Sequence, residues 1–577
     1  MNRYTFLFAA LSWFLTTMPL QAANMCRQAT TIRQSDGTTL VVFGHGDENF
    51  SWFTTSDGVL LVHQGTDFFV AQMDAAGRLV ATTQLAHEKE SRGKEEQLLV
   101  AAQNKTAFEQ FLTERMQQDL LANTIGNYTV PYFPHMGSPR VLVLLVQFPD
   151  QQFSCNDPLA TFNHYFNGGE LPANDILQQR NYGSVKQYFN DMSNGLFTPQ
   201  FDLKGPFTLS KNYAYYGADS GSKIDVNGQE LIHDACAMLT DVDLADYDND
   251  GDGKAELVYV LYAGYSQSRT GNSTDCLWPK SNTLTVTVGD KTQTLWYGMN
   301  NELNYEPNAT FTTYPEITRR INGIGLFCHE FSHTMGLPDL YPTTSDASVN
   351  NQGCEYWSLM DAGEYTDVGY TPTPYTPWEK EAMGWLTLPD MGKNQQHTLH
   401  NGEAVKIEGA NNEYLILHNL QKTGWASKMP GHGMLVYRID YPYTSVNSFD
   451  KPNNTKGLPA VTVVPADGLL LSSYQTTDGK RYLAEHEGDP FPGSSQRTSL
   501  ENVALNRSTL QTNITNISET DGVISFNYAD PVAIKLPQTA NKVAPLRWYT
   551  PDGTAVGSKR PTLPGIYVYG GQQVIVK

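Results

Sequence analysis

The sequence predicts a mixed α+β domain in the middle of the chain, followed by an all-β region. Two runs that are apolar on both faces, residues 141–148 and 257–263, have the pattern of buried strands. Helical spacing of apolar residues recurs at 185–190, 230–239 and 317–335. Strands and helices therefore mix between about 140 and 390. Beyond that point turn residues recur about every ten positions and helical patterns fade, which predicts a β-sandwich-like domain over 391–530.

The composition excludes several classes of protein. A chain of 577 residues is too long for one hydrophobic core, so several domains are expected. Lys and Arg number 39 against 60 Asp and Glu, and the formal charge of −21 repels polyphosphate. We therefore expect no nucleic-acid partner and a protein suited to binding cations. Since no later apolar stretch reaches 18 residues, no transmembrane segment is expected.

The N-terminus has the pattern of an export signal. Arg3 precedes an apolar run over residues 6–15, which is too short to span a bilayer, and small residues end the segment 20–23. Residues 1–23 are therefore predicted to be a signal peptide, and the protein is expected to be secreted or held at the cell surface. Cys26 lies close behind this signal, but the residues before it make a poor lipid-attachment motif.

Two small β units are expected to flank the main domains. Short apolar runs alternate with turns over residues 38–80, a helical pattern follows over 98–120, and prolines and glycines indicate a linker at 124–140. Together with the export signal this order predicts a pro-segment over 24–139, the alternative being an N-terminal domain that stays attached. Turn and strand signals near the C-terminus predict a separate β module over 531–577.

The most informative stretch has the sequence Phe327-Cys328-His329-Glu330-Phe331-Ser332-His333-Thr334-Met335-Gly336-Leu337-Pro338-Asp339. A helix places His329 and His333 one turn apart on the same face, where two imidazoles can share a zinc ion. Glu330 is rotated off that line and is expected to act as a general base on water instead of binding the metal. Gly336 can end the helix in a left-handed conformation, so that the chain turns back and brings Asp339 to the third ligand position.

A methionine after this motif supports the same interpretation. Met360 lies in the segment Trp357–Gly363, 27 residues after His333, as expected for a methionine turn beneath a metal. The helix, the glycine, the third ligand and this turn together predict a zincin-like, metzincin-type catalytic domain over 140–390. Glu355 and Glu364 are the alternative third ligands, and we favour Asp339 because the bend at the glycine explains how it reaches the metal.

These motifs resemble the immune inhibitor A family of secreted zinc metallopeptidases. The resemblance covers about 140–530 and is carried by the segments His329–Tyr341, Tyr356–Gly363, Gly384–Leu386, Pro430–Tyr437 and Gly488–Gly493. It implies that His329, His333 and Asp339 bind zinc and that Glu330 is the general base. Residues 531–577 more loosely resemble β modules that direct proteins to type-nine secretion, which implies the secretion machinery as a partner.

An acidic loop precedes the second apolar run and predicts a calcium site. Its expected ligands are Asp248, Asp250, Asp252 and Glu256. Carboxylates at alternate positions with a glycine at 253 resemble a calcium-binding loop. An earlier register would use Asp246, Asp248 and Asp250 with Gly251. Neither register has an acid where an EF-hand places its bidentate ligand, so an EF-hand is not expected. An exposed acidic turn is the alternative.

The expected function is hydrolysis of polypeptides by a secreted zinc endopeptidase, with catalytic Zn²⁺ and structural Ca²⁺. Tyr341 or Tyr365 is the expected second donor to the oxyanion, and the sequence does not choose between them. The pro-segment is expected to cover the cleft until it is cut. Cys26 could reach zinc as a thiolate, but a disulfide or a free thiol is the favoured state of this residue. Two other functions stay open: a catalytically inactive surface binding module, and a zinc amidase acting on cell-wall peptides.

Overall fold

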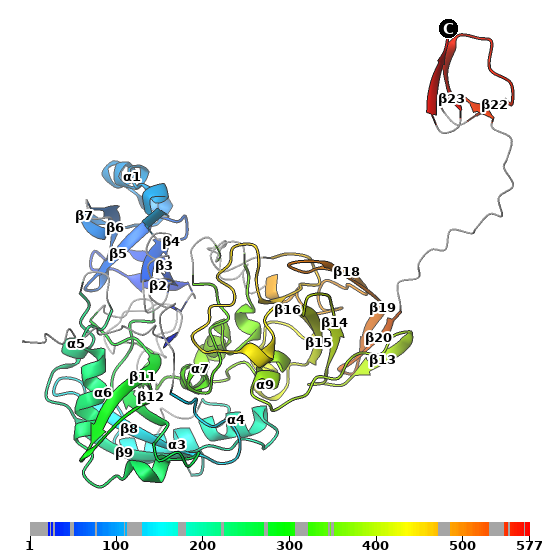
Figure 1. Cartoon of the computed structure of the whole chain (residues 1–577). Coiled ribbons are helices and arrows are strands. Elements are labelled where there is room, and N and C mark those ends of the chain that lie inside the picture. Colours follow the sequence, from blue (N-terminus) through cyan, green and yellow to red (C-terminus); the bar gives the residue numbers. More distant parts are fainter. Residues whose placement is uncertain are drawn as a thin grey trace, which may run out of the picture. The chain divides into compact units, whose positions relative to one another are not determined.

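A computed structural model represents the chain, and it divides into two compact units, Met1–Tyr528 and Ala529–Lys577, which are treated separately (Figure 1). The structure describes residues 21–22, 25–26, 29–46, 51–74, 78–108, 110–111, 130–170, 180–220, 224–269, 275–305, 321–343, 347, 351–470, 485–529, 547–551, 554–569 and 572–577. Most of the predicted signal peptide lies outside these residues. Among the described helices none is long and apolar enough to cross a membrane.

A six-stranded mixed sheet forms the centre of the first unit, in the order β1-β11-β12-β10-β8-β9. Its strands are β1 (Gln21–Ala22), β8 (Arg140–Gln147), β9 (Gln200–Thr208), β10 (Leu257–Tyr262), β11 (Lys280–Val288) and β12 (Lys291–Asn301). The four strands β8, β9, β10 and β12 are parallel, whereas β11 runs antiparallel to β12 and β1 antiparallel to β11. The sheet is therefore parallel at its centre with an antiparallel strand toward one edge.

The two apolar runs predicted as buried strands are confirmed as the neighbours β8 and β10, with Val258 opposite Leu142. Successive side chains of a strand point to opposite faces. Val141, Val143 and Leu145 accordingly join one hydrophobic cluster, and Leu142, Leu144 and Val146 join another. Both faces are covered, which explains why these runs carry no polar alternation.

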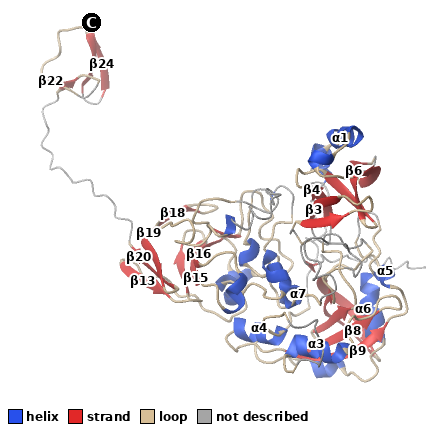
Figure 2. Ribbon diagram, turned by 180° about the vertical axis from the view of Figure 1, so that it is seen from behind, coloured by secondary structure: helices blue, strands red, loops and turns tan. Residues whose placement is uncertain are grey.

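Helices cover the two faces of this sheet. The first cluster includes residues of α3 (Pro158–Asn167), α4 (Val185–Met192), α7 (Ile324–Thr334) and α9 (Pro377–Ala382), and the second includes residues of α5 (Tyr213–Tyr216), α6 (Gly228–Ala237) and the 3₁₀ turn η2 (Leu244–Tyr247). Local caps define three helix starts: Asp157 accepts from Ala160 N, Ser184 from Gln187 N and Thr376 from Glu379 N. Figure 2 shows α3, α5 and α6 close to β8 and β9, with few helices near β13, β19 and β20.

A region of two four-stranded antiparallel sheets follows the mixed α/β part of the chain. One sheet has the order β14-β15-β16-β17, with strands Ala404–Glu408, Tyr414–Leu420, Gly433–Ile439 and Val461–Val463. The other has the order β13-β20-β19-β18, with strands Gln395–Leu399, Val523–Tyr528, Thr509–Thr520 and Leu500–Ala504. Side chains of both sheets, including Leu415, Leu417, Ile514 and Ile524, share one hydrophobic cluster. The mixed α/β part and the β region are thus found as expected, whereas the metzincin-type topology stays a prediction.

The N-terminal part of the first unit forms a six-stranded antiparallel meander, in the order β2-β3-β4-β5-β6-β7. Its strands are Thr30–Arg33, Thr39–Gly46, Ser51–Thr55, Leu60–Gln64, Asp67–Met73 and Leu79–Leu85, followed by η1 (Lys89–Ser91) and α1 (Lys94–Ala101). Its hydrophobic cluster includes Leu40, Val42, Phe68 and Val70. The helix continuing to residue 120 that the sequence predicts extends beyond the described residues.

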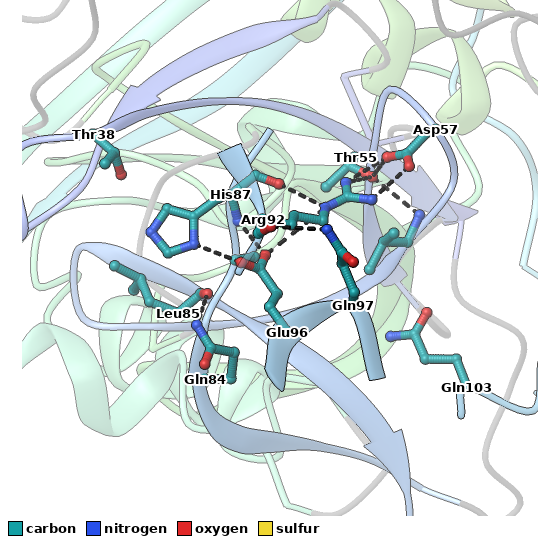
Figure 3. Close-up of polar contacts among 12 residues, drawn as sticks. Thr38, Thr55, Asp57, Gln84, Leu85, His87, Arg92, Glu96, Gln97 and Gln103 are labelled. Atoms are coloured by element: carbon teal, nitrogen blue, oxygen red, sulfur yellow. Dashed lines mark hydrogen bonds and ion pairs between the residues drawn. The ribbon is translucent and has the colours of Figure 1, made fainter. Parts of the chain in front are cut away.

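A polar network ties α1 to this meander (Figure 3). Arg92 donates two hydrogen bonds of 2.6 Å to the carboxylate of Asp57 and a third, of 3.0 Å, to the carbonyl of His87. The Glu96 carboxylate accepts from His87 N at 2.7 Å and contacts His87 Nδ1 at 2.8 Å. Because Arg92 and Glu96 are largely buried, these contacts hold the helix on the sheet.

The second unit is a four-stranded sheet in the order β22-β21-β23-β24. Its strands are β21 (Trp548–Tyr549), β22 (Ala555–Gly557), β23 (Gly565–Tyr569) and β24 (Gln572–Val576). The predicted hairpin is found, with Ile566 opposite Ile575, although the Gly570-Gly571 turn itself lies outside the described residues. Trp548, Tyr567 and Val576 form its small core.

Candidate metal centre

Helix α7 lies wholly inside the protein, and every one of its side chains is buried. Phe327 packs against Tyr259 of the sheet with ring centroids 4.2 Å apart, and Phe331 packs against Phe189 of α4 at 5.2 Å. These aromatic contacts fix the helix on one face. The opposite face carries His329 and His333, whose rings lie 4.7 Å apart and nearly perpendicular.

The bend after α7 has the conformation that the sequence predicts. Gly336 has a φ of +110°, which other residues rarely adopt, and a Cβ there would lie 3.3 Å from the ring of Tyr132. His333 donates from Nδ1 to the carbonyl of Leu337 at 2.7 Å, so the ligand helix and the bend hold each other. The chain then returns toward the two imidazoles and brings Asp339 to them.

The three predicted ligand residues converge in space. Nε2 of His333 lies 3.1 Å from Nε2 of His329, and Oδ1 of Asp339 lies 3.2 Å and 3.3 Å from these two atoms. Zinc bonds of about 2.0–2.1 Å at tetrahedral angles place neighbouring ligand atoms about 3.3 Å apart. The triangle therefore has the size of one face of a zinc coordination tetrahedron. Asp339 Oδ1 accepts no hydrogen bond from the described part of the chain although it is fully buried, which also fits a cation ligand.

Both imidazoles are held in the tautomer that a metal needs. Nδ1 of His329 donates to the carbonyl of Leu359 at 2.9 Å, just as Nδ1 of His333 donates to Leu337. A carbonyl can only accept, so each Nδ1 carries hydrogen and each neutral ring directs a lone pair from Nε2 to the centre. The Met360 carbonyl in turn accepts from Leu340 N at 2.8 Å. The segment containing Met360 thus holds both His329 and the chain just after Asp339.

Charge at the centre favours a bound cation. Burial lowers the pKa of His329, but nearby carboxylates, Glu364 foremost, outweigh it and raise that pKa to about 10. Burial lowers the pKa of His333. Burial also raises the pKa of Asp339, but Lys451 and the two histidines outweigh it and hold that pKa well below its usual value. The carboxylate therefore stays ionised beside the two rings, and a divalent cation can take the place of a proton at His329.

The other predicted site residues are buried close to this centre. Glu330 is fully buried on α7 beside His329, and its charge helps to raise the pKa of His329. Glu355 and Glu364, the alternative third ligands, lie outside the group of ligand atoms that Asp339 completes. Burial raises the pKa of Glu364 to about 8.

Both tyrosines that the sequence offers as the second oxyanion donor are buried. Tyr341 and Tyr365 have 2% and 3% of their surfaces exposed. Arg269 lies 4.8 Å above the ring of Tyr365, which places this tyrosine in a buried polar cluster.

Three contributors to the site were missed from the sequence. Lys451 donates from Nζ to Oδ2 of Asp339 at 2.8 Å from a position 112 residues away. The carbonyl of Leu359 has no sequence signal because it is a backbone group. Asp361 accepts from Cys354 N at 3.1 Å and Glu355 N at 2.8 Å and so shapes the turn that contains Met360. For Asp361, the sequence signal was its position directly after Met360.

In the acidic loop the structure brings together three of the four expected calcium ligands. Oxygens of Asp248, Asp250 and Glu256 lie within 4.8 Å of one another. Glu256 accepts hydrogen bonds from Asn249 N at 2.9 Å and Asp250 N at 3.1 Å, which fold the loop around it. The Asp252 carboxylate is not part of this group and accepts from Lys254 N at 2.9 Å. The loop lies beside a cavity of about 170 Å³ lined in part by Asp250 and Glu256.

A comparison with protein families finds a peptidase match for the residues that build this site. Residues 131–386 match the profile described as "Immune inhibitor A peptidase M6, catalytic domain". This segment contains the whole convergent group at the end of α7. Residues 131–386 are therefore similar to the catalytic domain of the immune inhibitor A peptidases.

The chain is also similar to two named proteins. The chain is 25% identical over 277 residues to "Pre-pro-metalloprotease PrtV" of Vibrio cholerae serotype O1, an alignment that covers 42% of this chain and 29% of the relative. It is 26% identical over 404 residues to "Immune inhibitor A" of Bacillus thuringiensis subsp. alesti, covering 61% and 57%. The chain thus spans less than a third of the first relative and somewhat more than half of the second.

Proposed function

We propose that this protein is a zinc-dependent endopeptidase that hydrolyses polypeptides, with His329, His333 and Asp339 as zinc ligands and Glu330 as the general base. The observation that carries the proposal is the triangle of two Nε2 atoms and one Oδ1 atom with sides of 3.1–3.3 Å. The peptidase M6 match over the same residues supports it.

The residues of the chain have separate roles in this reaction. A bound zinc ion would supply a Lewis acid that lowers the pKa of water to about 7. The carbonyls of Leu359 and Leu337 keep the two imidazoles oriented and neutral at Nε2. Glu330 takes the proton from the attacking water and passes it to the leaving amine. Its buried position keeps bulk water from competing for that proton.

The edge of the central sheet offers a place for an extended polypeptide. Helix α7 packs against β11 and β12. In the structure β1 pairs with β11 through Gln21 opposite Ser281 and Ala22 opposite Lys280. Because residues 1–23 are the predicted signal, its removal would leave the backbone groups of β11 available at this edge. An extended substrate can bind to such an edge by main-chain hydrogen bonds.

Replacing Glu330 by Gln tests the mechanism directly. Gln keeps the shape of the side chain but cannot accept a proton, so we expect the Glu330→Gln protein to retain zinc while casein hydrolysis falls by roughly two to four orders of magnitude. Zinc content is measured by elemental analysis and hydrolysis with a fluorescent casein. Glu501→Gln, an exposed change on β18, serves as the matched control and should cleave like the parent.

Three results would count against the proposal. If the Glu330→Gln protein hydrolyses casein at the parental rate, Glu330 is not the general base. If the parent protein holds no zinc and a chelator does not lower its activity, the reaction does not depend on a metal. Hydrolysis of muropeptides without hydrolysis of casein would favour a cell-wall amidase instead.

The acidic loop is proposed to bind a structural calcium ion. Support comes from the grouping of Asp248, Asp250 and Glu256 and from the cavity beside them. Carboxylate oxygens are the ligands that Ca²⁺ prefers. Asp252, the fourth predicted ligand, stays a prediction because its carboxylate lies outside the group. An ion here would connect the loop to β10, which begins one residue after Glu256.

The N-terminal part is proposed to be an inhibitory pro-segment of an exported enzyme. Met25 is fully buried in one cluster with Trp278 and Tyr305 of the catalytic part. Cys26 donates from its backbone N–H to the carbonyl of Ser268 at 2.8 Å, and Arg269 contacts its sulfur at 3.7 Å. These contacts support docking of the segment on the enzyme. Export by the signal peptide over 1–23 and sorting by the module over 531–577 are proposals that rest on the sequence.

A further inference from the structure

The Asp339 carboxylate is shared between two neighbours of different kinds. Oδ1 faces the imidazoles at 3.2 Å and 3.3 Å, whereas Oδ2 accepts a hydrogen bond of 2.8 Å from the ammonium of Lys451. Asp339 is fully buried, and only 11% of the Lys451 side chain is exposed. The ion pair is therefore largely shielded from water. Removing one partner of such a pair is costly, because the other charge is then left buried without compensation.

Lys451 comes from a different part of the chain than the histidines. It lies in the segment between β16 and β17 of the β region, beyond the residues 131–386 that match the peptidase profile. The lysine therefore reaches the candidate metal centre from outside the residues that match the peptidase profile.

The segment that carries Lys451 is fastened to the chain that follows Asp339. Asn453 is fully buried and donates to the carbonyls of Leu340 at 2.6 Å and Val461 at 2.7 Å. Asn454 donates to Thr343 Oγ1 at 2.6 Å and accepts from Thr343 N at 2.7 Å. Bonds from these two residues, which follow the lysine closely, to the stretch after the ligand make its position a built feature and not a chance surface contact.

From this geometry we infer that Lys451 is a positioning residue for the metal centre: its ammonium holds Oδ2 of Asp339, so that Oδ1 alone faces the two imidazoles. The inference rests on the proposed function and adds a residue to it. A carboxylate held in this way stays a single-oxygen ligand, and its charge is partly balanced by the lysine. Groups that orient a metal ligand from behind typically change metal affinity or activity about 10–100-fold when they are removed.

The test compares Lys451→Met with the parent in the full chain. Met keeps much of the apolar stem but neither charge nor donor, so Asp339 loses its partner at Oδ2. We expect zinc to pass to a chromogenic chelator about 10–100-fold faster from the variant. The visible absorption of the cobalt-substituted protein, which reports ligand geometry, should change, and kcat should fall with KM nearly unchanged.

Lys456→Met is the matched control, because Lys456 is an exposed lysine five positions further along the same segment. It should release zinc at the parental rate. Lys451→Arg keeps the charge and should restore most of the zinc retention. Should Lys451→Met not fold, Lys451→Gln carries the same expectation, since it also lacks the charge.

Zinc release from a folded Lys451→Met within twofold of the parent, with an unchanged cobalt spectrum, overturns the inference. That outcome leaves the proposed peptidase intact, since the parent would still bind zinc and cleave casein. Failure of the parent to bind zinc or to cleave casein would instead overturn the proposed function itself. The two failures are therefore distinguishable in one set of measurements.

Discussion

At the scale of single residues, several buried polar groups around the turn that contains Met360 have dedicated partners. Ser358 donates to Glu379 at 2.6 Å, and Trp357 donates from Nε1 to Asp489 of the β region at 2.7 Å. Asp361 accepts three backbone N–H groups around the turn that contains Met360. A buried polar group without a partner costs about 1–3 kcal/mol, so these contacts specify one arrangement of the turn under the metal centre.

His87 is predicted to make the attachment of α1 depend on pH. Burial lowers the pKa of His87, but hydrogen bonds to Asp36 and Glu96 outweigh it and raise the pKa above 6.5. The protonated ring therefore stabilises the folded state fully below pH 6.5, and this contribution is lost as the pH rises through the raised value. Hydrogen exchange of residues 85–101, corrected for intrinsic rates, should show weaker protection at pH 8.5 than at pH 6.

The His87→Gln protein should lose most of this pH dependence, because Gln has no charge to titrate. His400→Gln, a change of an exposed histidine in the β region, is the matched control and should behave like the parent. Equal protection of residues 85–101 at both pH values in the parent would contradict the prediction.

At the scale of elements, a single helix and the bend after it define the candidate metal centre. Aromatic packing of Phe327 and Phe331 fixes one face of α7, which leaves the opposite face for His329 and His333. The positive φ of Gly336 then reverses the chain within three residues of Asp339. Because all these steps are local, the order of residues along the chain is enough to predict the convergence.

The acidic loop before β10 provides the prediction for an element. If the loop binds Ca²⁺, calcium at a hundred times its dissociation constant should stabilise the folded chain by about 2.7 kcal/mol, measured as an upward shift of the thermal unfolding midpoint. Asp250→Asn removes a charge from the group of three carboxylates and should weaken calcium binding at least about tenfold in a calorimetric titration.

Asp241→Asn is the control for this loop, since the Asp241 side chain is 77% exposed and lies outside the carboxylate group. Its calcium affinity should equal that of the parent. A parent whose unfolding midpoint ignores both calcium and a calcium chelator would show the loop to be an exposed acidic turn.

At the scale of the whole molecule, the metal centre depends on chain segments that lie far from it in sequence. Residues of the expected linker pack on the mixed α/β part: Phe133 donates from its backbone N–H to the carbonyl of Thr334 at 2.8 Å, and Trp385 donates from Nε1 to the carbonyl of His135 at 2.7 Å. The match to the peptidase profile also begins at residue 131, nine residues before the predicted boundary at 140. A cut that releases the pro-segment should therefore fall before Pro131.

Latency is the prediction for the whole molecule. A specific protease site inserted between residues 124 and 129 should allow the pro-segment to be cut from the purified protein. If Met25 and Cys26 hold this segment on the enzyme, cleavage followed by its removal should raise hydrolysis of a short fluorogenic peptide at least about tenfold. The same site inserted after Ala529, where the second unit begins, is the control and should leave the activity unchanged. Equal activity before and after removal would refute inhibition by the pro-segment.

The sequence by itself determined what depends on neighbouring residues. Apolar runs predicted the strands β8 and β10 because burial on both faces leaves a continuous apolar pattern. The spacing from His329 to Asp339 predicted three side chains that converge, because one helical turn and one glycine bend are local geometry. Their binding of zinc and the roles of the four acids in the loop stay predictions that the proposed experiments address.

Only the tertiary structure decided the contacts between distant segments. The ammonium of Lys451 and the carbonyl of Leu359 reach the candidate metal centre because packed sheets and turns bring them there. Lys451 stands in none of the motifs used above, and the Leu359 carbonyl is a backbone group that no residue type signals. The docking of Met25 against Trp278 likewise joins residues more than 250 positions apart in the chain. A sequence pattern shows only which residues are near one another along the chain. Contacts between distant segments depend instead on how the core packs in three dimensions.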